Sequence, residues 1–148
     1  MSWKEVKNNE DVGNLLNTFG NFHDRCLKEL YMSTGSYVDE SLSMSISVNL
    51  DTTIRILFQR QYANPSAIEL LFEGVTQFCI SPNPKNHDSI IYEAKILCED
   101  DSFHWTDNID WYPNRGISPA NLISAQQLKW RDVSSWMGNR QRYGWSKE

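Results

Sequence analysis

The sequence predicts an α+β protein, predominantly a curved antiparallel β-sheet arranged as a meander, with one helix near the N-terminus. Three consecutive segments between residues 42 and 82 alternate apolar and polar residues, which is the period-2 pattern of strands with one face in water. Turn signals at Asp51-Thr52 and Asn64-Pro65-Ser66 separate the segments, so that neighbouring strands pair antiparallel. Such a sheet buries one face in a core, and its curvature is compatible with partial closure into a barrel or sandwich.

The clearest alternation lies in residues 42–50, where five apolar residues alternate with Ser and Asn. Residues 53–59 and 68–72 repeat the pattern. Gly74 marks a bulge or bend, after which the last segment continues to Ile80. We expect the three segments to contribute eight side chains to one core: Met44, Ile46, Val48, Ile54, Ile56, Phe58, Leu70 and Phe72.

Residues 9–19 predict the N-terminal helix. Four apolar residues fall at i, i+3, i+4 and i+7 and form one stripe, namely Val12, Leu15, Leu16 and Phe19. Asn8 or Asn9 can cap the start of the helix, and Gly20 can end it. We expect this helix to lie on the sheet.

Further strands are predicted on both sides of the meander. Residues 89–98 alternate again, and residues 103–106 follow a polar turn as the returning strand of a hairpin. Two segments, residues 22–33 and 122–131, fit either a strand or a helix. For residues 22–33 we favour a strand, because the predicted strand over residues 42–50 needs a hairpin partner. A strand over residues 122–131 would place Leu122, Leu128 and Trp130 on one face.

Size and charge limit the class of protein. The 148 residues are 40% hydrophobic and 22% charged, which suits one domain with its own core. We expect a single domain over residues 1–148, with a poorly ordered tail after about residue 133. The formal net charge of -5 opposes general nucleic-acid binding, which requires a cationic surface.

Three widely spaced cysteines, Cys26, Cys79 and Cys98, form no CxxC pair and indicate reduced thiols. The first residues lack the apolar stretch of a secretory signal, and no apolar run is long enough to span a bilayer. The sequence therefore predicts a cytoplasmic protein without a membrane or nucleic-acid partner.

No motif in the sequence defines a reaction. It contains neither a GxSxG elbow nor a glycine-rich phosphate loop, and the adjacent His23 and Asp24 would point to opposite faces of a strand. One acidic cluster contains a histidine, but its spacing matches no EF-hand loop: Glu99, Asp100, Asp101, His104, Asp107 and Asp110. We expect no catalytic residue, no metal site and no cofactor.

Two groups of residues are candidates for a binding surface. Arg55, Glu69 and Glu73 would form a polar stripe on the sheet face opposite the core. The second group lies on or beside the Pro-, Gly- and Asn-bearing loop of residues 107–119 and contains Trp105, Asp107, Asp110, Trp111, Tyr112 and Arg115. Aromatic loops held by a rigid sheet are common binding sites. The alternative is that Trp111 folds back and closes the end of the sheet.

Three short segments carry a resemblance to known proteins: Phe22-His23-Asp24, Ile68-Glu69-Leu70-Leu71-Phe72 and Lys129-Trp130-Arg131. In that order they resemble a group of small bacterial proteins of unknown function, some of which are similar to the immunity proteins encoded beside polymorphic toxins. The resemblance implies a bacterial cytoplasmic protein with a mostly antiparallel sheet and no established catalytic residues.

The leading functional hypothesis is a non-enzymatic protein-binding module, in particular an immunity-like protein that masks its partner. The acidic balance favours a basic partner such as a nuclease toxin, because complementary charge steers encounter. The alternative is a small-molecule-binding protein or an unrecognised hydrolase with a pocket in the curved sheet, near His23 and His104. Self-association into a homo-oligomer through an apolar sheet face is a third hypothesis.

Overall fold

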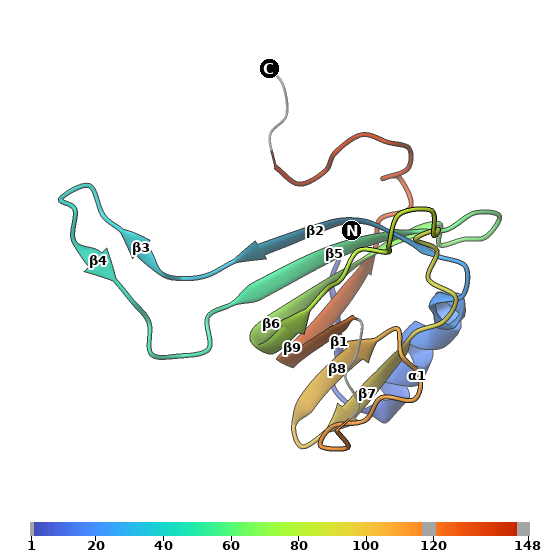
Figure 1. The fold of residues 1–148 in the computed structure, drawn as a ribbon, viewed down its shortest axis with the longest axis horizontal. Coiled ribbons are helices and arrows are strands. Elements are labelled where there is room, and N and C mark those ends of the chain that lie inside the picture. Colours follow the sequence, from blue (N-terminus) through green and yellow to red (C-terminus); the bar gives the residue numbers. More distant parts are fainter. Residues whose placement is uncertain (1, 117–120, 145–148) are drawn as a thin grey trace.

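The computed structural model describes residues 2–116 and 121–144, and its main feature is one curved antiparallel sheet (Figure 1). Six strands follow one another across this sheet in the order β2-β5-β6-β9-β8-β7, and β1 pairs with the part of β9 that β8 leaves uncovered. The strands are β1 Lys4–Val6, β2 Cys26–Ser33, β5 Thr53–Gln59, β6 Ala67–Cys79, β7 Lys95–Glu99, β8 Ser102–Thr106 and β9 Leu122–Asp132. The predicted α+β class is confirmed, and the curved sheet does not close.

The predicted N-terminal helix is confirmed as α1, Asn9–Thr18. The Asn8 side chain caps it by accepting a hydrogen bond from the backbone N–H of Asp11 at 2.9 Å. Gly20, with a φ of 60°, then turns the chain into the short 3-10 helix η1, Gly20–Phe22. The helix and this turn bring Leu15 and Phe22 into the core.

One cluster of buried side chains lies between α1 and the sheet. It contains residues from α1, η1 and every strand of the sheet except β2. From β2, Leu27 and Leu30 pack against the cluster but remain partly exposed. Five of the eight predicted core residues are fully buried there: Ile54, Ile56, Phe58, Leu70 and Phe72. The register of the central pair places Ile56 opposite Leu70 and Ile54 opposite Phe72, so these side chains share one face. The predicted antiparallel pairing of β5 and β6, with one face in the core, is therefore confirmed.

Gly74 bends β6, as the sequence predicted. Its φ is 65°, and the pairing with β9 shifts register between Val75 and Gln77. A Cβ at this position would lie 2.9 Å from the Gln126 side-chain oxygen of β9, so a larger residue would force the Gln126 side chain to shift and would also be strained by the positive φ. Because of the bend, Phe72 and Val75 both face the core, although a regular strand would place them on opposite faces.

The two ambiguous segments are strands. β2 begins at Cys26, within the segment for which a strand was favoured, and β9 covers residues 122–132. In β9, Leu128 and Trp130 belong to the core cluster, as expected for one face. Leu122 is buried but lies outside that cluster, because Ile123 and Ala125 occupy the core positions beyond the bend. The placement of Leu122 on the same face was therefore wrong.

The hairpin of β7 and β8 confirms the predicted turn and return strand. However, the predicted strand over residues 89–98 was wrong in its first half, since β7 begins only at Lys95. Its partner β8 ends at Thr106, which pairs with Lys95, so the preceding residues have no neighbouring strand there. Ile91 makes one isolated bridge to Arg25 instead, and Tyr92 is exposed.

Residues 34–52 form a projecting arm, which leaves the sheet between β2 and β5 and contains the short strands β3, Tyr37–Val38, and β4, Met44–Ser45 (Figure 1). The prediction that residues 42–50 form a core strand was wrong: Met44, Ile46 and Val48 are exposed. The arm extends beyond the rest of the sheet, where no other described element lies opposite its apolar side chains. Strict alternation indicates extended backbone, but it does not show whether a core lies against it.

The sheet face opposite the core is partly covered by the C-terminal segment, residues 133–144. A second, smaller buried cluster contains Leu57, Ala67 and Val133, with Trp136 and Tyr143 packed against it. Of the predicted loop over residues 107–119, residues 107–116 are described and contain no helix or strand, whereas residues 117–119 lie outside the described residues.

Candidate functional site

The arm is held as a hairpin by a small set of local contacts. Tyr37 pairs with Ser45 and Val38 pairs with Met44. At the tip, the Asp39 carboxylate accepts hydrogen bonds from the backbone N–H groups of Ser41 at 2.9 Å and Ser43 at 3.0 Å. These bonds fix the turn, so the arm presents a defined pair of extended segments to the solvent.

The arm exposes an unusual amount of apolar surface. Val48 is 100% exposed and Leu42 85%, and Val38 and Met44 are exposed neighbours across the β3–β4 pair. In all, seven large hydrophobic residues of the arm are exposed: Tyr37, Val38, Leu42, Met44, Ile46, Val48 and Leu50. Contiguous exposed apolar surface in a folded protein is typical of interaction sites.

The charge of the arm has one sign. Residues 34–52 contain Asp39, Glu40 and Asp51, and no Lys or Arg. Asp51 lies at the base of the arm, within 3 Å of where a Cβ on Gly35 would stand, so Gly35 lets the two segments approach there. The arm therefore combines an apolar surface with a net negative charge.

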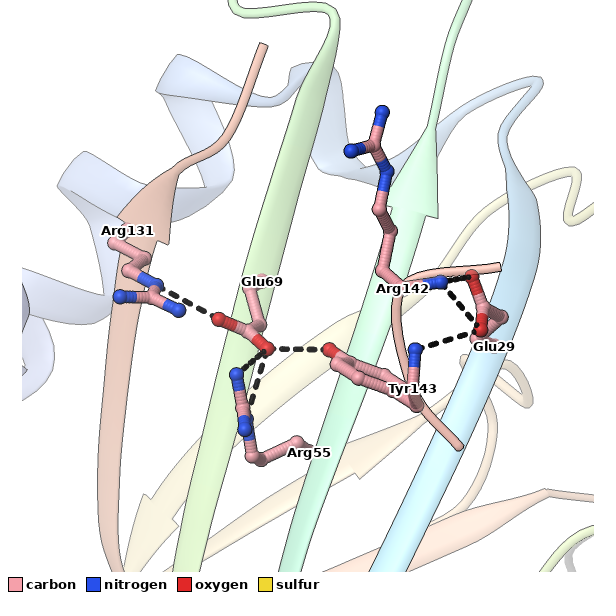
Figure 2. Close-up of polar contacts among 6 residues, drawn as sticks. All are labelled: Glu29, Arg55, Glu69, Arg131, Arg142 and Tyr143. Atoms are coloured by element: carbon pink, nitrogen blue, oxygen red, sulfur yellow. Dashed lines mark hydrogen bonds and ion pairs between the residues drawn. The ribbon is translucent and has the colours of Figure 1, made fainter. Parts of the chain in front are cut away.

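The second candidate region is a buried polar cluster on the sheet face opposite the core (Figure 2). Glu69 of β6 is fully buried, and its two carboxylate oxygens are bound from both sides. Arg55 of β5 lies 2.7 Å from Oε2, Arg131 of β9 lies 2.7 Å from Oε1, and the Tyr143 hydroxyl donates to Oε2 at 2.5 Å. Three neighbouring strands and the C-terminal segment thus meet at one carboxylate.

Glu29 of β2 holds the same C-terminal segment from the neighbouring strand (Figure 2). Its carboxylate accepts hydrogen bonds from the backbone N–H groups of Arg142 and Tyr143 at 2.9–3.0 Å, and Lys28 lies at 3.3 Å. Burial alone would raise the pKa of Glu29, but these N–H donors and Lys28 lower it overall. Burial, reinforced by the bond to Glu69, raises the pKa of Tyr143 far above its usual value. The cluster therefore clamps the segment with Tyr143 protonated and Glu29 ionised.

The predicted polar stripe is partly brought together by this arrangement. Arg55 and Glu69 pair directly, as the register of β5 and β6 allows, whereas Glu73 pairs with Lys129 at 2.9 Å, farther along the sheet. Glu73 raises the pKa of Lys129 through this contact. Since the C-terminal segment covers Glu69, that residue is not available as a surface for a partner while the segment is in place.

The predicted loop residues do not form one surface. Trp105 lies in the core and Trp111 is buried, with its ring centroid 5.5 Å from that of His104. Tyr112 is 40% exposed and lies beneath the cations of Lys95 and Arg115, at 3.6 Å and 4.7 Å from its ring centroid.

The two acids of this loop differ in their surroundings. Asp110 is exposed, whereas Asp107 accepts a hydrogen bond from the Asn121 amide at 2.5 Å. The burial of Trp111 against His104 matches the alternative in which Trp111 covers the end of the sheet.

His23 and His104, the two histidines considered for a pocket, do not converge on one. His23 bonds the backbone oxygen of Tyr92 through Nδ1 at 2.6 Å and lies 3.3 Å from Asp24, at the surface. His104 bonds the Ser124 hydroxyl at 2.6 Å beneath Trp111. Burial lowers the pKa of His104, although Glu99 and Asp100 act in the opposite direction. Within the described residues, no group of three His, Cys, Asp or Glu side chains is arranged to hold a metal ion.

Sequence reasoning missed the arm as a surface and Tyr143 and Arg131 as partners of Glu69. A signal for the arm was present, because residues 34–52 are apolar and acidic without a single basic residue. The contact between Tyr143 and Glu69 had no such signal, since 74 positions separate the two residues.

The fold and the arm define the class of protein only as an α+β domain built on one antiparallel sheet. Comparison of the chain with protein-family models, with curated proteins and with solved structures gave no match. In the part of the chain that the structure describes, no helix is long and apolar enough to cross a membrane.

Proposed function

We propose that this protein is a non-enzymatic protein-binding module and that the arm of residues 34–52 is the element that holds its partner. The observation that supports this proposal best is the exposure of seven large hydrophobic side chains on the arm. Leaving such residues in water does not help folding, because burying each of these side chains would stabilise the protein by about 1.5–3 kcal/mol. A partner that buries the arm would recover this free energy.

Charge indicates the chemistry of the partner. The arm has three carboxylates and no basic residue, and the whole chain has a formal net charge of -5. The complementary surface is an apolar groove with Lys or Arg at its rim, because such a rim pairs with Asp39, Glu40 and Asp51 and speeds encounter. The same charge disfavours a homo-oligomer built by apposing two arms, since like charges would then face each other.

The immunity-like hypothesis is consistent with this chemistry. An immunity protein masks a toxin by covering a surface that the toxin needs, and toxins that act on nucleic acid present a basic surface to the phosphate backbone. We propose that the arm enters or covers such a basic surface in a bacterial partner. The resemblance of residues 22–24, 68–72 and 129–131 to small bacterial proteins is the sequence basis for this part of the proposal.

The test uses two triple variants of the arm. The first replaces Met44, Ile46 and Val48 by Ser, and the matched control replaces Ser43, Ser45 and Ser47 by Ala. All six side chains are exposed, so both variants are expected to keep the denaturation midpoint of the unaltered protein. The unaltered protein is used to capture partners from extracts of its native host, and the captured protein is then purified and titrated.

We expect a basic partner that binds one to one and loses affinity as salt is added. The first variant should raise the dissociation constant at least about a hundredfold, because several buried apolar contacts are removed, and the control should change it by less than about threefold. A partner with enzymatic activity should be inhibited in the complex. An acidic partner, equal binding by both variants, or no captured protein would contradict the proposal.

A further inference from the structure

An open cleft lies where β2 begins and β5 ends, whereas the arm leaves these two strands at their other ends (Figure 1). Cys26 and Gln59, which pair across the two strands, both line it, and its volume is about 500 Å3, within the range of small-molecule sites. Gln59 donates hydrogen bonds to the backbone oxygens of Trp136 at 2.9 Å and Gly138 at 3.3 Å. These bonds hold Met137, between those two residues, at the cleft.

Two arginines that line this cleft, Arg25 and Arg60, bring their guanidinium groups together beside Gly20. A Cβ on Gly20 would lie 3.3 Å from Arg60 Nη1 and closer still to Arg25 Nη2. Gly20 has a φ of 60° and no side chain, so it leaves the space that this approach needs. Both guanidinium groups also lie against the Phe19 ring, with Cζ of Arg25 and Arg60 at 4.9 Å and 4.8 Å from the ring centroid. The fold thus holds two like charges next to each other.

Backbone oxygens, and no carboxylate, hold the two guanidinium groups in the described part of the chain. Arg25 donates to the oxygens of Phe19, His23 and Asp24, and Arg60 donates to those of Pro65 and Thr18. Arg60 is 9% exposed, and its Nη1 makes no hydrogen bond to a described residue while retaining accessible surface. The pair is therefore fixed in place, with N–H groups left for a further acceptor.

The charges around the pair favour an anion with a single charge. Burial lowers the pKa of both arginines, and the charge of Arg60 lowers that of Arg25 further. Asp24 acts on the pKa of Arg25 in the opposite direction, but it is the weakest of the three influences and also lies 3.3 Å from His23. The charged residues that line the cleft are these two arginines and Asp24, so one further negative charge balances them.

The geometry points to a binding site for a small carboxylic acid with an apolar body. Its carboxylate would accept hydrogen bonds from Arg60 Nη1 and Arg25 Nη2, since the planar guanidinium group matches a carboxylate. Its apolar body would pack on Ile90 and Met137, which line the cleft and are 45% and 41% exposed. A phosphate monoester with two charges is disfavoured, because its second charge would exceed the balance and face Asp24.

Three probes with the same apolar body test this site at pH 8: 3-phenylpropionate, its uncharged amide 3-phenylpropionamide, and the dianion 2-phenylethyl phosphate. Binding is followed by the 1H–13C signal of the Met137 methyl group, which Met137→Leu identifies by removing it. We expect 3-phenylpropionate to shift this signal saturably, with a dissociation constant below about 10 mM, which a ligand of this size can reach. The methyl signal of Met44, on the arm, should not move.

The amide should bind at least about tenfold more weakly than the carboxylate, because its oxygen carries no charge, and the phosphate at least about threefold more weakly. Failure of 3-phenylpropionate to saturate the Met137 signal, or equal or tighter binding of either other probe, would overturn the inference. These comparisons use the unaltered protein, so they decide the matter even if a variant of the arginine pair does not fold. None of these results bears on the arm.

Matched variants locate the binding. Arg25→Gln should weaken 3-phenylpropionate at least about tenfold, since a charged donor is lost. Lys7→Gln removes the same charge from an exposed side chain that does not line the cleft, and it should change the affinity by less than about twofold. Denaturation midpoints verify that both variants are folded, and an equal effect of the two substitutions would contradict the site.

Discussion

Arg131 Nε lies 2.7 Å from Glu69 Oε1, although 62 positions separate the two residues in the chain. The second oxygen of the same carboxylate is bound by Arg55 and Tyr143 (Figure 2). Burial of Glu69 removes it from water, and the two guanidinium groups and the hydroxyl replace that solvation. The arrangement connects β5, β6, β9 and the C-terminal segment, so its loss affects elements that are remote in sequence.

Glu69→Gln should destabilise the protein by about 3–5 kcal/mol, because it leaves two arginines without their counter-charge in a partly buried site. Glu73→Gln is the matched control on the same strand. Its carboxylate pairs with Lys129 near the surface, and we expect a denaturation midpoint close to that of the unaltered protein. Urea unfolding of both variants checks this prediction. Equal losses in the two variants would show that the Glu69 cluster has no special role.

Tyr143→Phe should release part of the C-terminal segment and should do so in a pH-dependent way. The pKa of Tyr143 is raised in the folded protein, so the folded state holds the hydroxyl proton more tightly than the unfolded state. The stability that the hydroxyl contributes is therefore complete below the usual tyrosine pKa of 10.0 and falls as the pH rises above it. Unfolding free energies of both proteins from pH 7 to pH 11 measure this difference. A difference that stays constant across that range would contradict the assignment.

Apolar residues of the core and apolar residues of the arm should differ in how much their replacement by Ala lowers the free energy of unfolding. Ile56→Ala and Phe72→Ala should each cost about 2–5 kcal/mol, because both side chains are fully buried and would leave cavities. Val48→Ala should cost less than about 0.5 kcal/mol, because Val48 is fully exposed on the arm. Chemical denaturation gives all three values. A large loss for Val48→Ala would mean that the arm packs against the domain in solution.

Trp111→Ala decides between the two roles considered for the loop. Trp111 is only 7% exposed and lies on His104, so we expect a loss of about 3–5 kcal/mol in stability. Tyr112→Ala, at the exposed neighbouring position, should have a clearly smaller effect. If Trp111 instead served a partner, its replacement would leave the melting midpoint nearly unchanged.

His104 should report on the same contact. Burial lowers its pKa below the usual 6.5, so the folded state binds this proton less readily than the unfolded state. The corresponding stability is present above pH 6.5 and is lost as the pH falls through the lowered pKa. In the Trp111→Ala variant, the imidazole ring of His104 is uncovered, and the pKa of His104 measured by NMR titration should rise towards 6.5. An unchanged titration would show that Trp111 is not what keeps water from His104.

Local patterns in the sequence were sufficient for most of the secondary structure. The Asn8 cap and the apolar stripe of α1 depend on residues within one or two turns, and the bend at Gly74 depends on the backbone freedom of a single residue. Alternation likewise identified β5 and β6, whose apolar residues lie opposite one another across the pair. Each of these features is decided by neighbours in the chain.

The sequence by itself therefore determined the α+β class, the central strands and the acidic, apolar composition of residues 34–52. Only the tertiary structure decided that these residues leave the sheet as an arm, because burial of Met44 or Val48 depends on whether another element lies opposite them. The same holds for Glu69, Arg131 and Tyr143, and for the approach of Arg25 to Arg60 beside Gly20. Contacts between distant residues follow from strand order and register, and local periodicity contains neither.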